Sequence, residues 1–138
     1  MTRKITALCL SLVLLISSFS ASAAARASDY LSSYTLGLLA KGDGLMSISY
    51  TVCGVEIMDK VGAVEIIVEE KIGSYWFEYQ VFDGEEDGLY STGTISKSGN
   101  LYFYGIPGTT YRATIIPYAE LDGGSDTGDL TCTPEVCI

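Results

Sequence analysis

Within the stretch Leu45-Met46-Ser47-Ile48-Ser49-Tyr50-Thr51-Val52-Cys53, a largely apolar set alternates with two serines and a threonine. The first set is Met46, Ile48, Tyr50 and Val52, and the second is Ser47, Ser49 and Thr51. Successive side chains of a β-strand point to opposite faces, so this period of two places the apolar residues on one face and the serines and threonine on the other. Such alternation is typical of a strand that packs one face on a core and turns the other to solvent. The stretch therefore predicts a strand of an antiparallel sheet.

Similar alternation recurs along the chain, and no helical pattern follows residue 30. In the run from 75 to 81 we expect the odd-numbered residues to face the core and Trp76 to face outward. Turn residues separate the runs about every ten residues, which indicates an antiparallel sandwich, because a parallel sheet would need long crossover helices. We therefore expect an all-β fold, a single antiparallel seven-strand β-sandwich. The expected strands are Tyr34–Ala40, Leu45–Cys53, Val64–Glu69, Tyr75–Val81, Leu101–Tyr104, Tyr111–Ile116 and Leu130–Val136.

The first 24 residues have the three parts of a secretion signal. Arg3 and Lys4 form the positive start, an apolar run extends from residue 5 to 16, and small residues follow with overlapping A-x-A sites. This order is typical of a signal peptide, and the apolar run is short for a membrane span. We expect an extracellular protein with cleavage between residues 23 and 28, preferably after Ala23, a flexible leader over 25–33 and a sandwich domain over 34–138.

The chain is acidic, with 17 aspartates and glutamates against 8 lysines and arginines and a formal net charge of −9. Removal of Arg3 and Lys4 with the signal peptide would leave 6 basic residues and a net charge of −11. An acidic protein repels nucleic-acid phosphates and anionic lipids. We therefore expect no nucleic-acid partner, and no membrane binding after cleavage.

The chain contains no histidine, which excludes Ser-His-Asp and Cys-His catalysis and histidine-bound metal sites. A pair of carboxylates, as in glycoside hydrolases, is the remaining route to an acid–base enzyme. The acidic residues fall mostly in expected loops and on outward strand positions, where solvation explains them. We therefore expect no catalytic residues, and no cofactor other than a weakly bound calcium ion.

Four carboxylates make Asp83-Gly84-Glu85-Glu86-Asp87-Gly88 the densest acidic run. Calcium binds clustered carboxylate oxygens on flexible loops, so Asp83, Glu85, Glu86 and Asp87 are candidate ligands. The spacing differs from that of an EF-hand loop, and a run of charges is usually a solvated loop. Both interpretations stay open.

Three cysteines follow the signal peptide, and an odd number in an exported protein leaves at least one thiol free or bridged to another molecule. Cys132 and Cys137 form the candidate disulfide if Pro134 and Glu135 turn the chain between them. In a straight strand, residues five apart lie about 16–17 Å apart, beyond the reach of a disulfide. Cys53 would then be a buried free thiol. The alternative is that the cysteines serve as small buried apolar side chains.

The aromatic residues Trp76, Tyr104 and Tyr118, with Tyr102, fall out of phase with the expected core positions. If they share one face, they offer a stacking platform for a sugar or an anchor for a protein partner. Ordinary cross-strand aromatic pairs on an exposed sheet are the alternative.

The segment Gly105-Ile106-Pro107-Gly108-Thr109-Thr110-Tyr111-Arg112-Ala113-Thr114-Ile115 resembles the end of strand E and the start of strand F in fibronectin type III domains. The resemblance implies a tyrosine corner, in which the Tyr111 ring packs in the core and its hydroxyl bonds to backbone near Ile106 to Gly108. Pro107 and Gly108 would precede it in the connection between the two strands. Tyr50 stands where this family has a core tryptophan.

Together these features favour a secreted, non-catalytic binding or structural module with an unknown protein or glycan as its partner. A carbohydrate-binding module that uses exposed aromatic residues is the first alternative, and a small secreted enzyme or inhibitor is the second. Sandwiches of this kind host many unrelated roles, so the fold class does not choose between these functions.

Overall fold

The computed structural model describes residues 28–138, and the predicted signal peptide and cleavage site lie outside this part of the chain. Residues 28–138 form strands and turns, with no helix that could cross a membrane. The strands are β1 (Leu31–Gly42), β2 (Leu45–Met58), β3 (Lys60–Ile72), β4 (Tyr75–Asp83), β5 (Tyr90–Ser91), β6 (Thr94–Tyr104), β7 (Thr110–Leu121), β8 (Gly124–Thr127), β9 (Leu130–Thr131) and β10 (Glu135–Val136).

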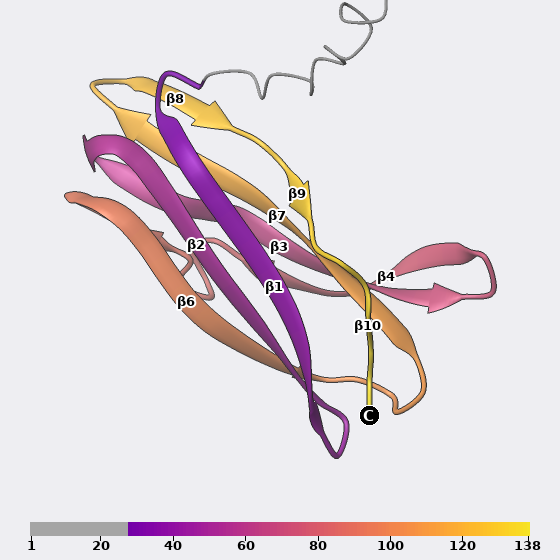
Figure 1. The fold of residues 1–138 in the computed structure, drawn as a ribbon. Coiled ribbons are helices and arrows are strands. Elements are labelled where there is room, and N and C mark those ends of the chain that lie inside the picture. Colours follow the sequence, from indigo (N-terminus) through magenta and orange to yellow (C-terminus); the bar gives the residue numbers. More distant parts are fainter. Residues whose placement is uncertain (1–27) are drawn as a thin grey trace, which may run out of the picture.

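The strands form two sheets that pack face to face (Figure 1). One sheet has three strands in the order β1-β2-β6. The other has seven strands on the path β10-β7-β3-β4, with β5 beside β3 and with β8 and β9 beside β7. All of these pairs are antiparallel. The expected antiparallel β-sandwich is confirmed, whereas the described part of the chain has ten strands rather than seven.

The last predicted strand, Leu130–Val136, is divided into the short strands β9 and β10. β9 pairs with β7 at Ile115, and β10 pairs with the same strand at Tyr111. Pro134 lies between the two short strands and has no backbone N–H to donate to a ladder. The interruption therefore follows from the backbone chemistry of proline. It adds one strand to the predicted seven, and the short strands β5 and β8 add the other two.

The core lies between the sheets and consists of the apolar half of each alternation. On β2, Met46, Ile48, Tyr50 and Val52 are buried, as the sequence predicts. Full burial of one such aliphatic side chain stabilises a fold by about 1.5–3 kcal/mol relative to exposure. The opposite sheet contributes the buried residues Ile66, Val68, Tyr111, Ala113 and Ile115.

Strand β4 differs from the predicted orientation of its side chains. A β-bulge leaves Tyr79 without a partner in the β3–β4 ladder. A bulge adds one residue to one strand, so the alternation changes phase there, and Phe82 is buried while Val81 is exposed. The predicted core residues Tyr75 and Phe77 are exposed as well, because the β3–β4 hairpin projects past the rest of the sandwich (Figure 1).

Strand β1 begins at Leu31, ahead of Tyr34 and within the segment expected to be a leader. Leu31 is buried, and its backbone N–H donates to Ser28 Oγ at 2.8 Å. The Ser28 hydroxyl donates in turn to Asp126 Oδ2 on β8. These contacts hold the start of β1 against the other sheet.

Candidate functional site

The outer face of the three-stranded sheet carries the hydroxyl half of the β2 alternation. The register places Thr51 between Thr35 on β1 and Ser98 on β6, and it places Ser49 beside Asn100 on β6. Directly paired residues of a ladder share one face of the sheet. Hydroxyl groups and one amide from three strands therefore meet on this face.

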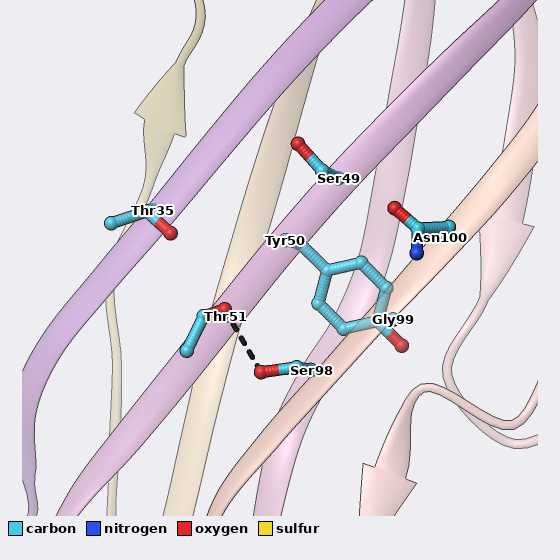
Figure 2. Close-up of a pocket in the computed structure, with 7 residues that line it drawn as sticks. All are labelled: Thr35, Ser49, Tyr50, Thr51, Ser98, Gly99 and Asn100. Carbon is cyan, nitrogen blue, oxygen red and sulfur yellow. Dashed lines mark hydrogen bonds between the residues drawn. The ribbon is translucent and has the colours of Figure 1, made fainter.

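These side chains of β1, β2 and β6 line a shallow depression of about 370 Å³ (Figure 2). None of its lining residues is charged. A Cβ atom at Gly99 would lie 2.7 Å from the Tyr50 hydroxyl oxygen, so the glycine leaves room for the Tyr50 ring against β6. Burial raises the pKa of Tyr50 above its ordinary value. The lining residues are Thr35, Ser49, Tyr50, Thr51, Ser98, Gly99 and Asn100.

One pair of hydroxyls in the depression is already ordered by the protein. Thr51 Oγ1 and Ser98 Oγ are 2.9 Å apart and form a hydrogen bond between β2 and β6 (Figure 2). A hydroxyl is both a donor and an acceptor, and an asparagine amide offers both functions as well. The depression can therefore exchange hydrogen bonds in both directions with a ligand.

Two tyrosines continue this face along β6. Tyr102 and Tyr104 follow Asn100 at intervals of two, so they lie on the same side of the strand. Tyr102 is 55% exposed and Tyr104 is 71% exposed. Their rings lie beyond the polar depression and extend the candidate binding face.

Trp76, Tyr104 and Tyr118 do not share one face. Tyr104 is on β6, which pairs with β2 in the three-stranded sheet. Trp76 on β4 and Tyr118 on β7 belong to the other sheet, because both strands pair with β3. Outward side chains of the two sheets point to opposite sides of a sandwich.

Trp76 and Tyr118 make specific contacts within the protein. The guanidinium carbon of Arg112 lies 4.2 Å from the centre of the Trp76 ring, and Arg112 Nε donates to Glu69 Oε1 at 2.9 Å. The Tyr118 hydroxyl donates to Glu120 Oε2 at 2.6 Å, and this hydrogen bond raises the pKa of Tyr118. Both side chains are thus engaged by contacts within the protein and do not form a free platform.

The predicted calcium ligands are not brought together. Asp83 Oδ1 accepts the backbone N–H groups of Glu85 and Glu86, and the Asp83 N–H donates to Asp87 Oδ2. Glu85 forms an ion pair with Lys60. Within residues 28–138, no group of three or more acidic or cysteine side chains is placed to hold a metal ion. The carboxylates instead stabilise the tight turn after β4.

The structure does not bring the candidate disulfide partners Cys132 and Cys137 together, and both cysteines and Cys53 are free in it. The segment runs extended beside β7, so the Cys132 N–H donates to Ala113 and the Cys137 N–H donates to Thr109. The acceptors are four residues apart, which separates the cysteines by roughly 13 Å along the strand. A disulfide needs Cα atoms within about 7 Å. Cys53 is half-buried rather than buried.

Tyr111 has the contacts expected of a tyrosine corner. Its ring is fully buried, and its hydroxyl accepts the backbone N–H of Ile106 at 2.8 Å. The turn ahead of it is closed by a hydrogen bond from Thr109 N to the Ile106 carbonyl. Pro107 fixes the first central position of this turn, and Gly108 has a φ of 90°, which favours glycine. Burial raises the pKa of Tyr111.

The described residues thus define an antiparallel all-β sandwich with an uncharged, hydroxyl-lined depression on one outer face. No family model, curated protein or solved structure matches the chain. The sequence pattern alone did not predict the depression, although the serines and threonine of the β2 alternation point to its central strand. Its partners on β1 and β6 became evident only when the register was known.

Proposed function

We propose that the protein is an exported, non-catalytic module that binds an uncharged glycan on the outer face of sheet β1-β2-β6. The observation that carries this proposal is the depression lined by hydroxyl and amide groups, with Tyr102 farther along the same face. Sugar hydroxyls both donate and accept hydrogen bonds, as Ser49 and Asn100 can. An exposed tyrosine ring offers an apolar surface for the C–H face of a sugar.

The preference for an uncharged glycan rests on electrostatics. The depression has no lysine or arginine to pair with a uronate or sulfate group. The chain has a formal net charge of −9, which repels anionic polymers at low ionic strength. A neutral polysaccharide needs no cationic partner in the depression and is not repelled by the negative charge of the protein.

The proposal includes two further points: that the sandwich is of the fibronectin type III-like kind, and that the protein is exported. If β8, β9 and β10 are counted as one interrupted strand beside β7 and the two-residue strand β5 is set aside, seven main strands remain, which supports a fibronectin type III-like assignment. The Tyr111 corner supports that assignment.

Export is supported by the Arg3 and Lys4 start and by the apolar and small-residue segments that follow. The absence of histidine supports a non-catalytic role.

Affinity electrophoresis and calorimetry with soluble β-glucan, mannan and dextran test the proposal, with polygalacturonate as an anionic comparison. We expect binding to at least one neutral polymer and none to polygalacturonate. Tyr102→Ala should weaken binding by about 1 kcal/mol, or about fivefold, through loss of ring contact. Asn100→Ala should weaken it by a similar factor, because a ligand group loses its partner.

The Thr114–Thr131 pair supplies a matched control. Thr114 Oγ1 and Thr131 Oγ1 form a 2.8 Å hydrogen bond on the outer face of the other sheet, as Thr51 and Ser98 do on the candidate face. Thr114→Ala should leave glycan affinity unchanged. Equal losses in Thr114→Ala and Asn100→Ala, or no binding to any neutral polymer, would contradict the proposal.

A further inference from the structure

The β3–β4 hairpin has an inner face, which packs on the other sheet near the core. At the end of the hairpin this face extends past the edge of that sheet. Along β3, Ile66 and Val68 are fully buried, whereas Ile72 at the same phase is 56% exposed. The hairpin end projects from the sandwich (Figure 1), so the other sheet does not cover it. Side chains on the inner face therefore contact the other sheet near the core, whereas those at the hairpin end are exposed to solvent.

Large apolar side chains gather on this uncovered face. Ile72 pairs with Tyr75, and Glu70 pairs with Phe77, so these four residues share one face of the hairpin. Tyr75 is 74% exposed and Phe77 is 49% exposed. We call Glu70, Ile72, Tyr75 and Phe77 the hairpin patch. Exposed apolar patches of this kind commonly mark interaction sites.

The patch carries a negative charge that has no ion-pair partner within residues 28–138. Glu70 lies opposite Tyr111 as well as Phe77, which places its carboxylate on the inner face of the sheet. The nearby cations are on the other face, where Arg112 binds Glu69 and both Arg112 and Lys71 lie over Trp76. The patch thus combines apolar surface with an unneutralised carboxylate.

We propose that the hairpin patch docks an apolar segment of a partner protein that carries a lysine or arginine opposite Glu70. The charge of the patch determines this choice of occupant, because a cation would pair with Glu70 as the apolar side chains exclude water. A second copy of this acidic chain would bring another Glu70 or further negative charge to the patch. This site lies on the other sheet from the glycan face and does not depend on the proposed function.

The test uses a short synthetic peptide in which each valine is followed by a lysine or a threonine. It measures how tightly this peptide binds to the purified protein. Amide NMR shifts locate the contact, and the same peptide with glutamate for lysine is the charge control. We expect the lysine peptide to shift amides at 70–77 and the glutamate peptide to cause no shift there. Glu70→Gln should weaken binding at least fivefold, and the effect should shrink as salt is added.

Phe77→Ser should abolish the shifts, and Tyr75→Ser provides the same test at a more exposed residue if the first variant does not fold. Ile95→Ser on the opposite sheet, where Ile95 is 51% exposed, should bind the lysine peptide as the unaltered protein does. The proposal is overturned by no shift at 70–77, by equal binding of the two peptides, or by an unchanged affinity in Glu70→Gln. It is also overturned if Phe77→Ser removes self-association in sedimentation or removes binding to phosphatidylcholine vesicles, since either result assigns the patch to another occupant.

Discussion

Replacement of Tyr111 by phenylalanine tests the tyrosine corner by removing one hydroxyl from the core. The Tyr111 ring is fully buried, and its oxygen accepts the Ile106 N–H at 2.8 Å. In Tyr111→Phe the ring can stay in place while this N–H loses its partner. An unpaired buried polar group costs about 1–3 kcal/mol. Because Ile106 lies in an exposed turn that water can reach, we expect a loss near about 1 kcal/mol.

Urea unfolding followed by tyrosine and tryptophan fluorescence measures this loss. With a slope of about 2 kcal/mol per molar urea, the midpoint of Tyr111→Phe should fall by about 0.5 M. Tyr111→Ala also removes core volume and should cost about 3–5 kcal/mol. The exposed Tyr102 gives the control, since Tyr102→Phe should change stability by less than about 0.5 kcal/mol. If Tyr111→Phe and Tyr102→Phe share the midpoint of the unaltered protein, the corner does not stabilise the fold.

Further predictions concern the thiols, the alkaline stability, one glycine and the N-terminus. Thiol titration in urea without reductant should find three free cysteines per secreted chain, and a count of one would restore the disulfide. Because burial raises the pKa of Tyr50 and Tyr111, stability should hold up to about pH 10 and fall above it as the unfolded chain ionises first; a urea midpoint that is equal at pH 8 and 11 would contradict this. Gly99→Ala should cost about 1–3 kcal/mol by crowding the Tyr50 ring, and an unchanged melting temperature would show that the ring can move. Mass spectrometry of the secreted chain should place its first residue just after a cleavage between residues 23 and 28, and a chain that retains Met1 would refute export by cleavage.

Local sequence pattern predicted the features that depend only on neighbours along one strand. The alternation from Leu45 to Cys53 identified a strand and its buried face, and the burial of Met46 and Ile48 confirms both. The Ile-Pro-Gly-Thr run indicated the turn that precedes Tyr111, since proline and glycine fix its backbone angles. These properties arise from side-chain direction and backbone sterics within a few residues.

The candidate binding face could be predicted only in part. Ser49 and Thr51 were on the solvent face of a predicted strand, but their neighbours come from β1 and β6, residues 35, 98 and 100. Asn100 lies outside the strands expected from the sequence, because Lys97 to Asn100 contains turn-forming residues. Pairing with β2 keeps this segment in β6, so tertiary hydrogen bonding outweighs local turn preference.

The sequence by itself determined that the chain forms alternating strands, that β2 buries its apolar half and that no histidine chemistry is available. Only the tertiary structure decided that Tyr104 and Trp76 lie on different sheets, that the bulge at Tyr79 changes the phase of β4, and that the hairpin projects beyond the core. The physical reason is the range of the interactions. Alternation within a strand is set by adjacent backbone units, whereas sheet membership, register and coverage depend on hydrogen bonds and packing between segments far apart in the chain.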